Sequence, residues 1–306
     1  MKLVLSLNNQ NYMSDYISMG IDTYVLGNPY SFHTPYSFSV EEMKKMKEQY
    51  PQIHFYASLS ALYDQHVISE LEAYIDQLNE IGIDGIVFQD FGVLQIVKEK
   101  GYTFDMMYSP ETLNTNVNTL NILHEEGVTS AFISKVIPLE EQKYIAKYAS
   151  MPVMMFAHGV EYIAASKRAL LSNYHDASQL DFTMDEKDAL TIQARNSKQE
   201  FYIYEDKKGT HIFSKTRLYT LDLMSQLEDF DYLYIETLMM NDQEAIEIAS
   251  LYSDALHSYE KGTYTKDITA YKELLWKLKT PLDRGFLFDQ TVYKLEDMRK
   301  IDNEKR

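Results

Sequence analysis

Eight short apolar runs recur along this chain of 306 residues, and they constrain its fold more than any other feature. The runs are rich in β-branched and aromatic side chains, and they occupy residues 2–7, 23–27, 54–60, 85–90, 104–109, 130–135, 152–159 and 231–238. Each is followed by a polar segment with helical periodicity. Because the runs are almost continuously apolar rather than alternating, they predict strands that are covered on both faces, as in a parallel sheet.

The segments between the runs have the pattern of crossover helices. Residues 68–78 carry one apolar stripe, and residues 246–259 carry another. Residues 39–42 match a capping box, and Ser109 with Pro110 predicts an N-cap followed by proline at the first helical position. Eight strand–helix units spaced by about 20 to 30 residues predict a closed (β/α)8 TIM-like barrel. An open doubly wound sheet is the competing fold, but the sequence has no glycine-rich first turn to favour it.

One connection is far longer than the others, with about 70 residues between the seventh and eighth runs. Within it, residues 201–215 form two alternating runs around a Lys-Lys-Gly turn, which predicts an inserted β-hairpin. We therefore expect a barrel over residues 1–260 with an insertion at about 160–222. Residues 261–306 would form a short C-terminal extension with one helix and a charged tail, whose last residues would fray.

The composition excludes several kinds of site. The chain has no cysteine, which rules out disulfides, thiolate nucleophiles and cysteine-ligated zinc or iron–sulfur clusters within it. With 46 acidic and 29 basic residues the net charge is −17, so a polyanionic partner would need a local basic patch. Basic residues do gather in the predicted insertion, namely Lys167, Arg168, Lys207, Lys208, Lys215 and Arg217. No run reaches the roughly 20 apolar residues of a membrane span, and the N-terminal run is too short for a signal peptide, so we expect a cytoplasmic protein without a membrane partner.

Polar side chains follow the predicted strands, where the working residues of a (β/α)8 barrel lie. Three of them, His158, Asp90 and Glu236, are the candidate catalytic group. An imidazole and carboxylates at one mouth could exchange protons with a substrate or hold a metal ion, whose presence the sequence leaves open. The competing interpretation is that each side chain satisfies neighbouring polar groups at the rim. The sequence contains no phosphate loop, dinucleotide fingerprint, calcium loop, nucleophile elbow or two-histidine metalloprotease helix.

Residues 156–174, FAHGVEYIAASKRALLSNY, resemble the signature of the collagenase-like peptidases, peptidase family U32. That signature is roughly F-x-H-G-A-x-C-x-x-x-S-G-x-C-L-L-S. The positions that match it in register are His158, Gly159, Ser166, Leu170, Leu171 and Ser172.

Three further segments are similar to the same family. Residues 85–92 resemble its D-G-I-I-V-Q-D-L-G strand end, and residues 231–236 resemble its strand ending in I-E-G-R. Ser109 and Asn116 fall where the family has S-T-Q-x-N-x-x-N. The resemblance therefore covers most of the predicted barrel and implies the same fold.

The chain also departs from the family pattern. Both cysteines of the signature are replaced, by Tyr162 and Ala169, and Thr237 stands after Glu236 in place of the glycine and arginine. Lys135 lies at the end of a strand, in a pair with serine where the family has Arg-Glu. The resemblance implies that longer members of the family use their cysteines for an iron–sulfur site, which this chain cannot build.

The resemblance carries expectations about function. Family members are named as peptidases of uncertain catalytic type, and several are implicated in RNA modification, including the prephenate-dependent 5-hydroxylation of the wobble uridine of tRNA. Some bacteria have a short and a long paralogue side by side, and this chain resembles the short kind. The expected partners are a longer cysteine-bearing paralogue, a small anionic ligand, and tRNA held by that paralogue or by the basic insertion. The alternatives are an endopeptidase and a catalytically inactive structural partner.

The resemblance and the strand ends together also suggest which residues bind the substrate. The expected substrate-binding residues are Ser109, Asn116, Gly159, Ser166 and Arg168. The cofactor stays unknown at this point.

Overall fold

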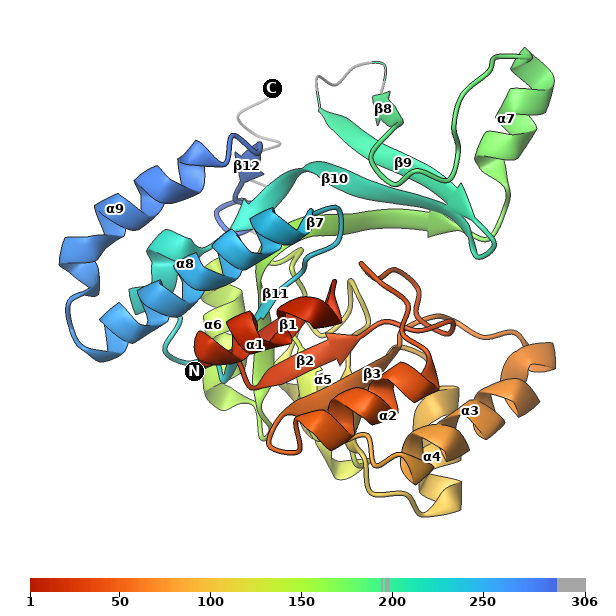
Figure 1. Ribbon diagram of the computed structural model, residues 1–306, viewed down its shortest axis with the longest axis horizontal. Coiled ribbons are helices and arrows are strands. Elements are labelled where there is room, and N and C mark those ends of the chain that lie inside the picture. The colour runs from red at the N-terminus through yellow and green to blue at the C-terminus, as the bar shows by residue number, and fades with distance from the viewer. Residues whose placement is uncertain (194, 196–198, 291–306) are drawn as a thin grey trace, which may run out of the picture.

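The computed structural model describes residues 1–193, 195 and 199–290, and its centre is a closed barrel of parallel strands (Figure 1). The barrel strands in chain order are β1 (Lys2–Ser6), β2 (Thr23–Leu26), β3 (His54–Leu59), β4 (Gly85–Phe88), β5 (Asp105–Tyr108), β6 (Ser130–Phe132), β7 (Val153–Ser166) and β11 (Tyr232–Ile235). Each strand pairs in parallel with the next in this order, and β11 pairs with both β7 and β1. These last pairings close the ring, so the predicted (β/α)8 TIM-like barrel is confirmed.

Helices cover the outside of the barrel and connect most of its strands (Figure 1). The connecting helices are α1 (Met13–Ser18), α2 (Val40–Gln49), α3 (Ile68–Glu80), α4 (Phe91–Lys100), α5 (Val117–Glu125) and α6 (Leu139–Tyr148), and α8 (Asp242–Glu260) follows the last strand. Short 3-10 helices are η1 (Gln10–Tyr12), η2 (Gln65–Val67) and η3 (Leu221–Gln226). In the connection from β7 to β11, η3 takes the place of a barrel helix.

One of the two predicted helix starts is right and the other is wrong. The capping box is present at α2, where the side chains of Ser39 and Glu42 each bond to the other residue's backbone. No helix begins at Ser109 and Pro110. Instead α5 is capped by Asn116, whose side chain accepts a hydrogen bond from the backbone N–H three residues later at 2.9 Å. The reason is that the intervening turn contains residues with positive φ, which cannot belong to a right-handed helix.

The core has two layers, one inside the barrel and one between the barrel and its helices. The inner layer consists of buried side chains that point into the barrel, namely Val4, Val25, Tyr56, Val87, Met107, Met154 and Tyr234. The outer layer is larger and takes in the apolar stripes of the helices. Because the inner layer fills the barrel below its C-terminal end, any ligand must bind above it, among the strand ends and their loops.

The predicted hairpin is confirmed and extends the barrel sheet. It consists of β9 (Glu200–Asp206) and β10 (Gly209–Tyr219), and β10 pairs antiparallel with the part of β7 that continues beyond the barrel. The short strand β8 (Thr191–Gln193) pairs with β9, and α7 (Leu170–Ser178) follows β7. Figure 1 shows the β9–β10 turn overhanging the loops that follow β2 and β3.

The C-terminal extension contains the expected helix, α9 (Tyr264–Lys277), and then a two-residue strand, β12 (Leu282–Asp283), that pairs with β10. The charged tail, and with it the expected fraying of the last residues, lies outside the described residues. The boundaries drawn at residues 160, 222 and 260 stay a prediction.

A β-bulge interrupts β7 at the mouth of the barrel. Tyr234 of β11 is paired with Phe156, but the next residue, Ile235, is paired with His158, so β7 has one extra residue at this point. The extra residue breaks the alternation of side chains along β7. Phe156 still faces the inside of the barrel, whereas His158 faces the outer layer, where its ring contacts Tyr252 of α8 at 5.5 Å between centroids.

Gly159 completes the bulge in a backbone conformation that other residues adopt only with strain. Its φ is +131°, and a Cβ atom at this position would lie 2.5 Å from the carbonyl oxygen and 2.8 Å from the Cβ of Glu236. The match of this glycine to the family signature therefore has a steric cause.

We expect Gly159→Ala to lower the free energy of unfolding by about 2 kcal/mol more than Gly82→Ala, because only the first combines backbone strain with a steric overlap. Gly82 also has positive φ, +69°, but a Cβ there would meet no atom within 4 Å. Urea denaturation of both variants measures the difference. Equal losses would contradict the role given to the bulge.

Candidate active site

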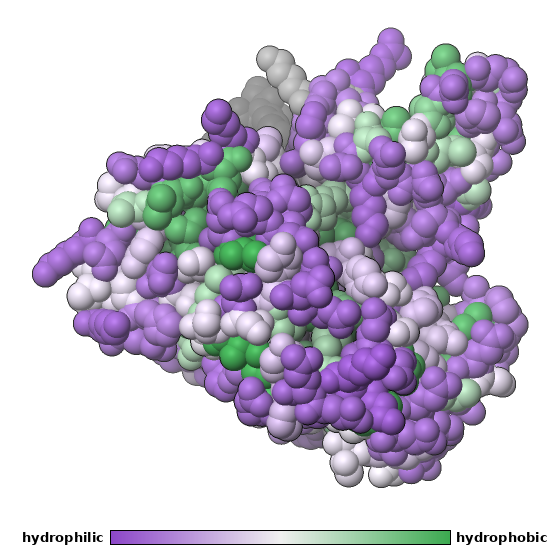
Figure 2. Space-filling model, viewed as in Figure 1, coloured by the Kyte–Doolittle hydropathy of each residue, from purple (hydrophilic) through white to green (hydrophobic). Residues whose placement is uncertain are grey.

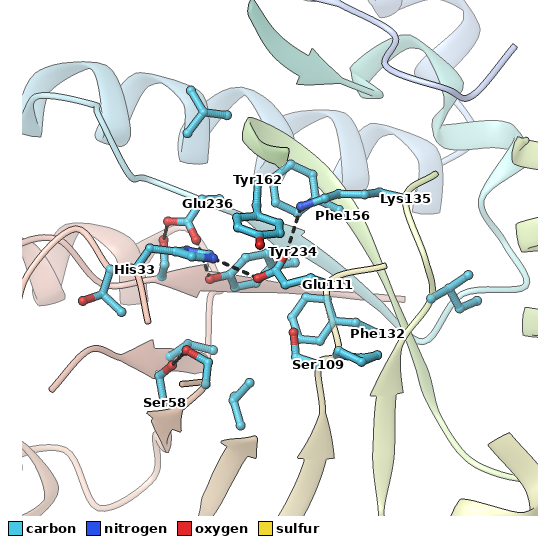
Figure 3. Close-up of a pocket in the computed structure, with 18 of the residues that line it drawn as sticks. His33, Ser58, Ser109, Glu111, Phe132, Lys135, Phe156, Tyr162, Tyr234 and Glu236 are labelled. Carbon is cyan, nitrogen blue, oxygen red and sulfur yellow. Dashed lines mark hydrogen bonds and ion pairs between the residues drawn. The ribbon is translucent and has the colours of Figure 1, made fainter. Parts of the chain in front are cut away.

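One small cavity lies at the C-terminal ends of the barrel strands (Figure 3). Its polar lining comes from strand ends and loops around most of the ring, and consists of Ser6, His33, Thr34, Ser58, Ser60, Ser109, Glu111, Lys135, Tyr162, Tyr234 and Glu236. Its volume is about 60 Å³. A cavity that holds benzene has about 150 Å³, so a ring-sized ligand would enter only if some side chains moved.

A buried ion triad occupies the centre of this cavity. The Glu111 carboxylate lies 2.8 Å from Nε2 of His33 and 3.1 Å from Nζ of Lys135, as Figure 3 shows. The three side chains are between 9% and 13% exposed. They come from the loops after β2, β5 and β6, and closure of the barrel brings these loops together.

Local structure holds each member of the triad in place. Glu111 lies in a turn where both it and Asn114 have positive φ, +61° and +66°, and the Asn114 side chain donates to the carbonyl of Phe132 at 2.9 Å. Lys135 lies over the ring of Phe156 at 5.1 Å and over that of Tyr162 at 5.8 Å, and these cation–π contacts help to fix its position.

The charges in the triad are matched. Burial on its own would raise the pKa of the Glu111 carboxyl, but Lys135 and His33 beside it outweigh burial and lower the pKa to about 2. The carboxylate is therefore ionised at any physiological pH. Lys135 and His33 together form a binding site for a carboxylate, and Glu111 occupies it.

Glu236 lines the same cavity, and groups outside the ion triad hold its carboxylate in place. One carboxylate oxygen accepts hydrogen bonds from Oγ of Ser6 at 2.7 Å and from the backbone N–H of Leu238 at 2.9 Å. The other accepts from the hydroxyl of Tyr234 at 3.1 Å. Burial raises the pKa of Tyr234 well above its usual value, so this phenol keeps the proton that it donates. The arrangement orients Glu236 toward the cavity, and Glu236 forms no ion pair within the residues that the structure describes.

The other two predicted catalytic residues do not lie in this cavity. His158 is fully buried, its Nδ1 is 3.5 Å from the hydroxyl of Tyr252, and its Nε2 has no hydrogen-bond partner among the described residues. Burial, and to a smaller extent Arg217, lowers the pKa of His158 to about 3, so the ring is neutral. The backbone carbonyl of His158 accepts from the N–H of Glu236 at 2.8 Å, but the two side chains face opposite layers.

The Asp90 side chain instead binds backbone N–H groups. It is the N-cap of α4, accepting hydrogen bonds from the backbone N–H groups of Gly92 at 2.8 Å and Tyr63 at 3.1 Å. The structure therefore brings only Glu236 of the predicted catalytic group to the mouth cavity. The catalytic roles of His158 and Asp90 stay predictions without a shared site.

The predicted substrate-binding residues are likewise spread out. Ser109 lines the cavity, and Gly159 packs against the backbone of Glu236. Asn116 is exposed at the start of α5. Ser166, at the end of β7, accepts a hydrogen bond at 3.2 Å from the backbone N–H of Arg168, whose side chain is exposed. Their binding roles stay predictions.

Sequence reasoning missed the triad. Lys135 lies at a predicted strand end, but nothing in the sequence assigned a partner to it. His33 and Glu111 lie in irregular loops, where no periodicity marks which side chains point inward. The one available signal was that Glu111 directly follows the Ser109–Pro110 pair, where a turn rather than a helix start would have drawn attention to it.

Two features are absent from the described part of the chain. No group of three His, Cys, Asp or Glu side chains in residues 1–193, 195 and 199–290 lies close enough to hold a metal ion. No helix within the same residues is long and apolar enough to cross a membrane.

Comparison with known proteins identifies the family. The family model described as Peptidase family U32 matches residues 9–297. The chain belongs to peptidase family U32. This confirms the family that the signature segment indicated.

Several known proteins are similar to this chain. The tRNA hydroxylation protein P2 of Bacillus subtilis (strain 168) is 24% identical over 290 residues, which cover 90% of this chain and 94% of that protein. The tRNA hydroxylation protein P of Escherichia coli (strain K12) is 28% identical over 110 residues, which cover 35% of this chain and 24% of that protein. A solved structure of a U32 peptidase aligns with 79% of this chain and 94% of its own, with a TM-score of 0.47 and 11% identity.

We expect Lys135→Met to lower the free energy of unfolding by about 3 kcal/mol, because it leaves a buried carboxylate without its main counter-charge. Adding Glu111→Gln should recover at least about 1 kcal/mol of that loss. Lys143→Met is the matched control, since it removes an exposed ion pair with Glu140 and should cost under about 0.5 kcal/mol. Urea denaturation gives all of these values, and additive losses in the double variant would contradict the triad.

Proposed function

We propose that this U32 protein takes part in the hydroxylation of tRNA, as the short subunit of a prephenate-dependent system that modifies the wobble uridine. The observation that carries the proposal is the likeness to the tRNA hydroxylation protein P2 along 94% of that protein's length. The proposed place of action is the cytoplasm.

The proposed partner is a longer, cysteine-bearing U32 protein. The segment that matches the tRNA hydroxylation protein P makes up only 24% of that protein, which is therefore much longer than the shared part. This chain has no cysteine, so any cysteine-ligated cluster in the system would have to lie on the partner. The partner would also supply positive charge for RNA that a chain of net charge −17 lacks.

The mouth cavity suits a small carboxylic acid, once Glu111 has moved aside. Lys135 and His33 would then bind the ligand's carboxylate, since they already hold one. Nδ1 of His33 is buried and has no hydrogen-bond partner among the described residues, so it has capacity for another bond. The rings of Phe156, Tyr162 and Tyr234 would pack against the rest of the molecule. Prephenate, an acid with a ring, has this chemistry.

Glu236 is the candidate for proton transfer at the mouth. Its carboxylate faces the ligand cavity and is oriented by three hydrogen bonds, so it would not need to reorganise when a ligand binds. The arrangement of these residues supports binding, orientation and proton exchange.

The endopeptidase alternative has no comparable support. Within the described residues, the serines that line the cavity are not hydrogen-bonded to a histidine; the Ser58 and Ser60 hydroxyls bond to each other at 3.0 Å, and Ser6 bonds to Glu236. A serine nucleophile needs such a base.

Deletion of the gene should remove 5-hydroxyuridine derivatives from tRNA, and the wild-type gene should restore them. Glu236→Gln should restore less than about a tenth of the wild-type level if the carboxylate transfers a proton, whereas Lys45→Gln, a change on the exposed face of α2, should restore it fully. Mass spectrometry of tRNA nucleosides measures the level. Unchanged nucleosides in the deletion strain would refute the proposed function.

A further inference from the structure

Three lysines surround a second pocket beside the barrel mouth. Lys187 comes from the segment before β8, and Lys207 and Lys208 form the turn between β9 and β10. The opposite wall is the loop of residues 28–37 after β2, and the pocket has a volume of about 420 Å³. In Figure 2 the surface where the hairpin meets these loops is mainly hydrophilic.

Two of these lysines are held by the loop through backbone oxygens. Nζ of Lys187 donates to the carbonyl of Thr34 at 2.8 Å, and Nζ of Lys208 donates to the carbonyl of Ser31. No ion pair joins any of the three lysines to a carboxylate within the described residues. Because an ammonium group has three N–H donors, most of their donors are left for another partner.

The acidic residue next to the cluster is already engaged. Oδ1 of Asp206 lies 2.8 Å from Nε2 of His211 and accepts from the backbone N–H of Lys208, also at 2.8 Å. Its side chain is 40% exposed, so solvent screens much of its charge. Asp206 therefore compensates the lysine cluster only in part.

The cluster is unusual for this chain. Acidic residues outnumber basic ones by 46 to 29, and other lysines of restricted exposure have carboxylate partners, such as Lys47 with Asp84 and Lys100 with Asp76. Lys187 and Lys208 are half-buried and Lys207 is exposed, and none of them forms an ion pair with a carboxylate in the described part of the chain. Solubility does not require half-buried lysines of this kind. The cluster would be stabilised by an anion that binds between the amines.

The pKa shifts of Lys187 and Lys208 also favour a bound anion. Burial lowers the pKa of Lys187 and that of Lys208, although the carboxylates of Asp206 and, for Lys187, Glu236 oppose this. The positive charge of Lys187 makes a smaller contribution that also lowers the pKa of Lys208. The two ammonium groups thus repel each other in a partly dehydrated pocket. A bound anion would remove this repulsion and satisfy the free N–H donors.

We propose that Lys187, Lys207 and Lys208 bind a phosphate group. A phosphate has the charge and the several acceptor oxygens that converging ammonium groups require. The groove next to the lysines favours the backbone of an RNA strand as the molecule that carries this phosphate. This part of the inference rests on the proposed function.

A groove connects the lysines with the barrel mouth. Lys207 and Lys208 also line a groove of about 540 Å³ that contains the rings of Tyr30 and Tyr63 and reaches Tyr162 and Glu111 at the mouth. A strand with one phosphate on the lysines would place a neighbouring base against these rings. The groove would then lead the strand toward the ion triad.

The test compares Lys187→Gln/Lys208→Gln with Lys45→Gln/Lys266→Gln, a control that removes the same charge from exposed positions. Calorimetry with pyrophosphate measures whether the lysines bind phosphate. Filter binding of a tRNA anticodon stem-loop at several salt concentrations measures whether RNA supplies that phosphate. We expect the pocket variant to bind pyrophosphate at least about tenfold more weakly than the wild-type protein. The slope of log K for RNA binding against log salt concentration should decrease by about 1, which corresponds to the loss of one phosphate contact. Lys187→Arg/Lys208→Arg keeps the positive charges and should bind both pyrophosphate and RNA as the wild-type protein does. That result would show that the positive charge, and not the identity of the lysine side chains, is what the site requires.

The possible outcomes separate the claims. Loss of pyrophosphate binding with unchanged RNA binding would support the phosphate site and contradict RNA as its source. Equal losses in the pocket variant and the control, or no pyrophosphate binding by the wild-type protein, would overturn the site. None of these results depends on the nucleoside analysis, so failure here and failure of the proposed function are distinguishable.

Discussion

The pairing of β11 with both β7 and β1 is the constraint on which the rest of the structure depends. It joins the end of the chain's barrel region to its beginning, so that Ser6 and Glu236, separated by 230 positions in sequence, are 2.7 Å apart. Closure also places the loops after β2, β5 and β6 around one cavity. The ion triad of His33, Glu111 and Lys135 exists only because the ring is closed.

The length of β7 adds a second level of organisation. Its first half is a barrel strand, and its second half pairs with β10 to carry the hairpin over the mouth. The bulge between Phe156 and Gly159 marks the change from one role to the other. The lysine pocket and the aromatic groove arise from this overhang, because the hairpin turn supplies one wall and the barrel loops supply the other.

The sequence was enough to predict the strands, because eight apolar runs on a parallel sheet leave few alternatives, and the hairpin, because its alternation differs from theirs. Glu236 lines the mouth cavity because it directly follows the regular strand β11, and its catalytic role stays a prediction. His158 does not face the mouth because a bulge turns it toward α8. Gly159 was the one residue in the sequence that marked this interruption of the strand. Glu111 and His33 were missed because their positions depend on irregular loops that only tertiary packing orders.

The account depends most on the buried charge of Glu111 between Lys135 and His33, and carbon-13 NMR of the Glu111 side-chain carboxyl tests this directly, with Glu111→Gln to assign the signal. We expect the carboxyl to stay ionised far below its ordinary value of 4.5, toward a pKa of about 2. The corresponding stabilisation would be complete above pH 4.5 and would be lost as the pH falls toward 2. A titration centred near 4.5 in the folded protein would mean that the mouth is open to solvent and the triad is not formed.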